Sequence, residues 1–129
     1  MTKFEMKTIG TLLSLLQTSS DPEAQRLSAL AIANCVFTAQ CRCSLVQEEL
    51  TLLSSLIDYI DNDEKDHQGR NYCAMVIGNL AAEAENRGEI VKLGAIEAVL
   101  KLLRSYPKNA EAGRFGAFAL SILAAVEKY

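Results

Sequence analysis

Apolar residues recur along the chain with the spacing of one helix face. The pattern apolar-x-x-apolar-apolar-x-apolar-apolar begins at Ile9, again at Leu53 and again at Ile96. Each run fills positions i, i+3, i+4 and i+7, which lie on one side of an α-helix. The runs start 44 and 43 residues apart. We therefore predict one helix around each run, at about residues 4–18, 49–60 and 95–104.

A second pattern with nearly the same offsets predicts longer helices. The segments 29–36, 74–81 and 117–124 align with one another at offsets of 45 and 43 residues and are apolar nearly all round. Such a helix is expected to pack on several sides. Asp21, followed by Pro22, and Asn109 are suited to cap helix starts. The long helices are predicted at about residues 22–38, 67–84 and 110–126.

Short helices complete the predicted architecture. They are expected at about residues 40–48 and 86–93, the second one stopped by Gly94 as a C′ glycine, and 61–66 is a polar loop. Eight helices with a period near 44 residues indicate an all-α fold of the α-solenoid type. The predicted single domain, 1–129, contains three repeats, at about 4–38 (without its first short helix), 39–84 and 85–129.

The composition agrees with this class of fold. Of 129 residues, 50% are hydrophobic and 6% aromatic, and Leu and Ala number 18 and 17. Such a chain favours helix over strand. With only 2 Pro residues, it also excludes collagen and disordered low-complexity protein.

The charge excludes some partners. Lys and Arg number 13 against 16 Asp and Glu, for a net charge of −3, so we expect neither nucleic acid nor an anionic membrane as a partner. The longest uncharged stretch, Leu27 to Cys41, is too short to span a bilayer. Four cysteines without a secretion signal indicate reduced thiols and a cytoplasmic protein, with the nucleus as an alternative.

Two groups of residues resemble the armadillo repeat family. The stretch Asn86 to Ile96, with the Gly94-Ala95 junction, is similar to the start of an armadillo repeat. The segments Ala29 to Asn34 and Ala74 to Leu80, which contain Asn34 and Asn79, are similar to the third helix of that repeat. HEAT repeats are the close rival, and these positions favour armadillo. The second repeat departs from the pattern, because Glu48-Glu49 stand where the third has Leu93-Gly94. The resemblance implies a right-handed superhelix.

The resemblance also implies a function. Armadillo proteins are non-catalytic modules that bind a partner protein or extended peptide along a concave groove of third helices. There a repeated Asn pairs with the peptide main chain, since an amide is both donor and acceptor. Asn34 and Asn79 match this position, and the third position is Ile122. The predicted groove residues are Arg26, Leu30, Asn34, Asn71, Met75, Asn79, Arg114, Phe118 and Ile122.

The side chains in the groove narrow the class of ligand. Leu30, Met75 and Phe118 stand where importin-α-like members have Trp, which argues against a receptor for nuclear-localisation signals. The groove of the β-catenin type is strongly basic. Here Arg26, Asn71 and Arg114 stand eight residues before the Asn position, and Glu83 stands four residues after Asn79. The groove is therefore mixed in sign, and no charge class of ligand is implied. The alternative is that the polar positions are solvated helix faces and the apolar stripe is repeat core.

No catalytic, cofactor or metal site is predicted, and we expect no enzyme. Cys41-x-Cys43 with His67 and Cys73 has suitable zinc ligands, but residues i and i+2 of a helix point about 200° apart. The carboxylates between Asp58 and Asp66 lack the spacing and Gly of a calcium loop, and predict an exposed acidic rim. Gly113 and Gly116, inside a predicted helix, are expected to allow close packing.

Self-assembly is the alternative function. The last helix carries Phe115, Phe118, Ile122 and Val126 with no following repeat to cover them, and the first repeat begins with Phe4 and Met6. Repeat arrays need capped ends. The end-face residues Phe4, Met6, Phe115 and Val126 are therefore predicted to pair in a homo-oligomer, or to be covered in a longer armadillo array.

Overall fold

The computed structural model describes residues 3–36 and 50–125, and in this part of the chain every regular element is a helix. The predicted all-α fold is confirmed. The predicted short helix at 40–48 lies outside the described residues. The helices are α1 (Lys3–Thr18), α2 (Pro22–Cys35), α4 (Leu50–Asp61), α5 (His67–Ala81), α6 (Ala84–Lys92), α7 (Ala95–Ser105) and α8 (Ala110–Leu123).

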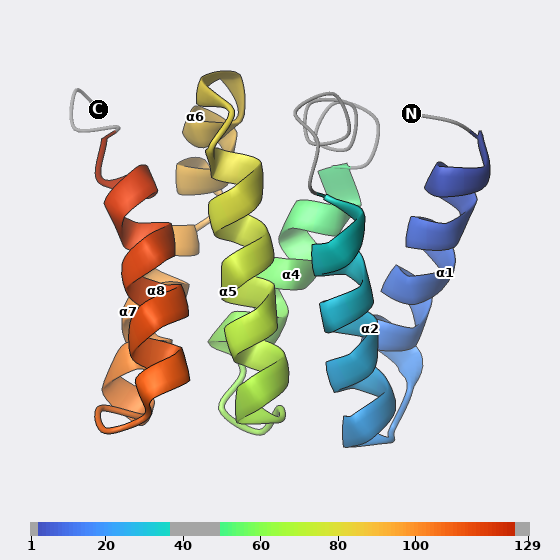
Figure 1. Cartoon of the computed structure of the whole chain (residues 1–129), viewed down its shortest axis with the longest axis horizontal. Helices are drawn as coiled ribbons and strands as arrows, with labels where there is room; N and C mark the ends of the chain where they lie inside the picture. Colours follow the sequence, from blue (N-terminus) through green and yellow to red (C-terminus); the bar gives the residue numbers. More distant parts are fainter. Residues whose placement is uncertain (1–2, 37–49, 126–129) are drawn as a thin grey trace.

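The helices form two layers. In the first layer α2, α5 and α8 lie side by side, with α5 in the middle (Figure 1). In the second layer α4 contacts α7 and, at fewer points, α1. α5 packs on α4 and α8 packs on α7. α2 packs on α1, which lies beside α2 on the side away from α5 (Figure 1). α6 packs against α5 and α7. The first layer therefore presents an outward surface built from three neighbouring helices.

The hydrophobic core lies between the layers. The predicted apolar face of α4 is buried, with Leu53, Leu56 and Ile60 fully enclosed. From α5, Ile77 and Leu80 are equally buried. Burying such a side chain stabilises the fold by roughly 1.5–3 kcal/mol, so both layers depend on this contact.

Each first-layer helix begins with a capping side chain. The carboxylate of Asp21 accepts a hydrogen bond from the Glu23 amide at 3.1 Å, and Pro22 follows it in the first turn. The side chain of Asp66 accepts a hydrogen bond from the Gly69 amide, and that of Asn109 accepts one from the Ala112 amide, at 2.8 Å each. These bonds satisfy amides that have no partner within the helix. The predicted caps at Asp21 and Asn109 are confirmed.

The turn between α6 and α7 needs a glycine. Gly94 has φ of +94°, in the left-handed region that favours glycine, and the prediction that it ends the preceding helix is confirmed.

The long helices end earlier than predicted. α5 ends at Ala81, not at about residue 84, and α8 ends at Leu123, not at about 126. Beyond α5, Asn86 donates its side-chain amide to the Leu80 carbonyl at 2.8 Å, and Arg87 donates to the carbonyls of Ala81 and Ala82. Side chains of α6 thus satisfy the last carbonyls of α5, and the chain turns there.

Glycines set the closest helix contacts. A Cβ on Gly78 would lie 2.5 Å from the Phe118 ring, and one on Gly116 would lie 2.6 Å from Leu103. Close packing at Gly116 was predicted correctly. The same prediction for Gly113 is wrong, because nothing lies within 4 Å of its Cβ position.

Candidate partner-binding surface

The outward face of α2, α5 and α8, called the row face below, carries most of the predicted groove residues. Positions 30 and 34, 75 and 79, and 118 and 122 are each four residues apart on their helix, so each pair shares one side. Asn34 is exposed, Phe118 keeps 38% of its surface, and Leu30, Met75, Asn79 and Ile122 are half-buried. Solvent therefore reaches amide and apolar side chains on all three helices.

Asn71 is a correction to the predicted groove. Its side chain is fully buried. Neither its amide nitrogen nor its carbonyl oxygen has a hydrogen-bond partner among the described residues. A partner on the row face has no access to this side chain.

The two arginines of the predicted groove have different surroundings. Arg26 of α2 is half-buried and pairs with the Asp66 carboxylate, with 3.3 Å between Nη1 and Oδ1. Since Asp66 caps α5, this contact ties the start of α5 to α2. Arg114 of α8 is exposed.

The aromatic residues of α8 pack towards α5. Phe118 lies against Gly78, and the Phe115 ring is 6.4 Å from the Tyr72 ring between centroids. Gln68 of α5 also donates to Glu111 of α8 at 3.3 Å. The contact between α5 and α8 is therefore continuous along the row face.

Two residues of the predicted end face are partly covered within the chain. Phe115 is half-buried against Tyr72, and Met6 is half-buried against the core. Their role in self-association stays a prediction. Val126 and the side chain of Phe4 lie outside the described residues.

A second apolar set lies on this surface and was not predicted as part of the groove. Leu27 of α2 is 54% exposed and Tyr72 of α5 is half-buried. Together with Phe115 they stand at offsets of 45 and 43 residues, the same offsets that relate Leu30, Met75 and Phe118. That shared offset was the available signal.

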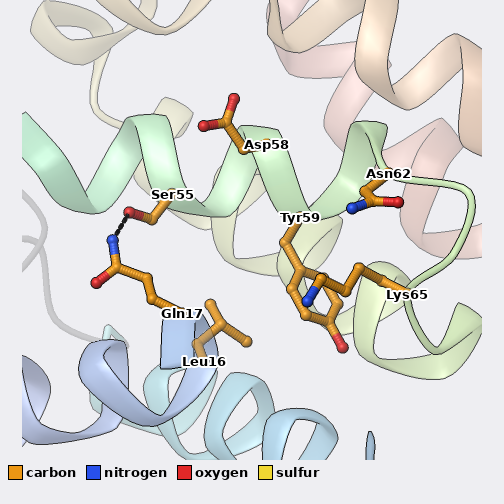
Figure 2. A pocket seen from close by; sticks show the side chains of 7 residues that line it. All are labelled: Leu16, Gln17, Ser55, Asp58, Tyr59, Asn62 and Lys65. Carbon is orange, nitrogen blue, oxygen red and sulfur yellow. Dashed lines mark hydrogen bonds between the residues drawn. The ribbon is translucent and has the colours of Figure 1, made fainter. Parts of the chain in front are cut away.

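A hollow of about 190 Å³ lies on a different side of the protein, between the end of α1 and α4 (Figure 2). The amide of Gln17 donates to Ser55 across it, and the ammonium of Lys65 lies 5.6 Å from the centre of the Tyr59 ring. Asp58 points away from that ring in this view. Small-molecule pockets usually measure about 300–1,000 Å³, so this hollow is small for such a ligand.

A second hollow, of about 370 Å³, separates α4 from the turn between α6 and α7. Its charged side chains are the carboxylates of Asp58, Asp61 and Glu97 and the ammonium of Lys92. Its volume lies at the lower end of the range for small-molecule pockets, and it lies away from the row face.

The predicted acidic rim is partly ion-paired. Lys101 of α7 lies 3.9 Å from Asp61 and 3.8 Å from Asp63, and all three side chains are about half exposed. Exposed pairs of this kind contribute about 0–1 kcal/mol. They join the loop after α4 to α7 without building a binding site.

The candidate zinc and thiol residues are not brought together in the part that the structure describes. Cys73 is fully buried, and His67 is exposed beside Tyr106, with ring centroids 5.0 Å apart. Cys41 and Cys43 lie outside the described residues. No group of three His, Cys, Asp or Glu side chains suited to a metal ion occurs within 3–36 and 50–125.

Two buried acidic groups stay protonated in the folded protein. Burial raises the pKa of the Cys73 thiol well above its ordinary value of 9.0. Burial, and then the neighbouring Cys73 and Asp66, raises the pKa of the Tyr59 hydroxyl well above 10.0. Neither group can act as a thiolate or phenolate near neutral pH.

These shifts predict a loss of stability in alkali. The unfolded chain releases both protons near pH 9.0 and 10.0, while the folded chain keeps them, so the free energy of unfolding falls as pH rises above about 9. Each group contributes up to about 1.4 kcal/mol per pH unit. Thermal unfolding between neutral pH and pH 11 measures the slope.

Tyr59→Phe separates the two groups. It is expected to flatten the decline above pH 10, and to cost little near neutral pH because the hydroxyl has no hydrogen-bond partner among the described residues. An unchanged alkaline slope in this variant would show that Tyr59 does not contribute.

The comparisons with known proteins give a fold and no family. No protein-family model matches the chain. No curated protein matches it. The chain is similar to a solved structure described as an engineered protein, with a TM-score of 0.76 and 26% identity over 91% of this chain and 45% of that one. The chain thus spans under half the length of that structure. No helix in the described part is long and apolar enough to cross a membrane.

Proposed function

We propose that this chain is a non-catalytic protein-interaction module of the armadillo type, which binds a partner protein or extended peptide on the row face. Its three units would be α1 with α2, residues 39–84 with α4 and α5, and residues 85–129 with α6 to α8. The supporting observation is the row of α2, α5 and α8, which exposes side chains at matching positions on neighbouring helices.

The amide side chains suit a peptide main chain. Asn34 and Asn79 lie on adjacent helices of the row, 45 residues apart. Asn34 is exposed, and Asn79 is half-buried at the surface. Each amide offers a donor to a carbonyl and an acceptor to an N–H group. With Ile122 in the third position, the amide ladder has two members.

The apolar side chains suit a partner with apolar side chains of its own. Leu30, Met75 and Phe118 form one line across the three helices, and Leu27, Tyr72 and Phe115 a second line at the same offsets. Two of these six, Leu27 and Phe118, keep 54% and 38% of their surface. Covering them would supply affinity that does not depend on the charge of the partner.

The test uses peptides selected from a displayed random library on the wild-type protein. The double variant Asn34→Ala, Asn79→Ala is expected to bind them about tenfold more weakly, because two main-chain hydrogen bonds are lost. Phe118→Ala is expected to weaken binding by a similar factor. Fluorescence titration measures the affinities, and NMR shift mapping with a bound peptide should move the signals of Asn34, Asn79 and Phe118.

Ser54→Ala is the matched control, since Ser54 is exposed on α4 in the other layer, and its affinity should equal that of the wild type. The proposal fails if peptide binding shifts signals on α1 and α4 instead, or if the double variant binds as well as the Ser54 control.

A further inference from the structure

The two ends of the helix row have different surfaces. At one end, Leu15 of α1 and Leu27 of α2 are 42% and 54% exposed. At the other end, the exposed side of α8 carries small residues, Gly113, Ala117 and Ser121, each four positions from the next. Bulky apolar side chains at one end and small ones at the other are complementary shapes.

We propose that two copies of the chain associate head to tail, with the exposed side of α8 in one copy docked against α2 in the next. The interface would repeat the contact by which α5 docks on α2 and α8 docks on α5. This inference concerns the ends of the row and does not depend on peptide binding to the row face.

A charge pair supports this arrangement. Within the chain, Arg26 of α2 pairs at 3.3 Å with Asp66, the residue that caps α5. Arg114 follows Arg26 by 88 residues at the matching position of α8, and Asp21, which caps α2, precedes Asp66 by 45. Both Arg114 and Asp21 are exposed.

Arg114 is directed to the side from which a second copy would approach. Ala112, two positions earlier, is buried, and two positions correspond to about 200° around a helix. A second copy docked on α8 as α5 docks on α2 brings its Asp21 to Arg114. Between α5 and α8, Asn71 stands at the position of the arginine and Asn109 at the position of the aspartate. The charge pair is therefore not a feature of every contact in the row.

The packing of side chains transfers in the same way. Phe118 of α8 covers Gly78 of α5. At the new contact, Leu30 of the second copy takes the place of Phe118, and Ser121 of α8 takes the place of Gly78. Phe115 packs on Tyr72, and the matching pair is Leu27 of the second copy against Phe115. A bulky residue meets a small or aromatic one in each case.

One matching pair opposes association. The hydrogen bond from Gln68 to Glu111 would be replaced by Glu111 facing Glu23 of the second copy, and like charges repel. Glu23→Gln places an amide opposite the Glu111 carboxylate again and is expected to strengthen association several-fold.

Because the two docking surfaces differ, association is heterologous and can continue from copy to copy. The weight-average mass of the wild type should rise with concentration above the 14.1 kDa of one chain, as measured by sedimentation equilibrium. Arg114→Glu and Leu27→Glu are each expected to weaken association about tenfold or more, by repulsion from Asp21 and by loss of an apolar contact.

Mixing these two variants is the decisive experiment. Each variant retains the surface that the other lacks, so the mixture should form one-to-one dimers and nothing larger. Lys92→Glu, an equal charge reversal at an exposed position of α6, should assemble as the wild type does. Circular dichroism verifies that each variant folds.

Three outcomes would overturn the proposal. They are a wild type that remains at the mass of one chain at all concentrations, a mixture of the two variants that stays monomeric, and single variants that assemble as well as Lys92→Glu.

Discussion

Replacing Gly78 by valine is expected to lower the free energy of unfolding by about 3 kcal/mol, at the upper end of overpacking costs. The Cβ alone would lie 2.5 Å from the Phe118 ring and 3.3 Å from the Cα of Ala119. The ring can move outward because Phe118 is 38% exposed, but the backbone of α8 cannot move without separating α8 from α5. Urea unfolding followed by circular dichroism measures the loss.

Substitutions to alanine calibrate this prediction. Gly10→Ala and Gly88→Ala lie in helices with nothing within 4 Å of the Cβ position, and should stabilise the protein by about 0.5–1 kcal/mol. Gly78→Ala should lose that gain, because the ring of Phe118 has to move. Gly88→Val measures the cost of valine in a helix without a close neighbour. If Gly78→Val destabilised the protein no more than Gly88→Val, the contact between α5 and α8 would accommodate the added volume, and the prediction would be wrong.

The same contact matters for the proposed function. Phe118, Phe115 and Tyr72 hold α8 beside α5 and are also part of the row face. A separation of the two helices would change the distance between the positions of Asn79 and Ile122. The Gly78 variants therefore test whether binding depends on the spacing of helices in the row.

Local signals in the sequence predicted the beginnings of helices well. Asp21 and Asn109 cap their helices because a short side chain reaches amides only two or three residues away. Gly94 adopts a positive φ for an equally local reason. Such features depend on a few adjacent residues, and the sequence shows all of them.

Features that depend on a neighbouring helix were predicted less well. The end of α5 at Ala81 is set by Asn86 and Arg87, which reach back from α6. The helical spacing placed Asn71 on the row face with Asn79, but its side chain is fully buried. Phe115 was assigned to the end face because it lies on the last helix, and its contact with Tyr72, 43 residues earlier, was not predicted. The sequence alone does not show how far each helix is rotated towards the next.

Arg70 shows the same limit for a charged residue. Arginine is mostly exposed in proteins, and nothing in the pattern marked this one, yet it is fully buried. Its Nε donates to the Ile60 carbonyl at the end of α4 at 2.7 Å, and its guanidinium carbon lies 5.7 Å from the centre of the Tyr106 ring. The side chain thus joins α4, α5 and the end of α7.

Arg70→Ala is expected to lower the free energy of unfolding by about 3 kcal/mol, because it leaves a cavity and an unpaired carbonyl at Ile60. Arg70→Met retains most of the volume and removes a buried charge. The terminal nitrogens of Arg70 have no hydrogen bond among the described residues. The ion pair of Nη2 with the exposed Asp63 carboxylate is long, at 3.7 Å. Such replacements are often nearly neutral, so a loss of about 1 kcal/mol is expected, mainly from the Ile60 carbonyl.

Arg104→Ala, at an exposed position of α7, serves as the control and should change stability by less than about 0.5 kcal/mol. Urea unfolding of the three variants separates volume from charge at Arg70. If Arg70→Met were as destabilising as Arg70→Ala, the hydrogen bond to Ile60 and the contact with Tyr106 would outweigh packing. The guanidinium would then be the group that holds α4 and α7 together around the start of α5, and so fixes where the middle helix of the row begins.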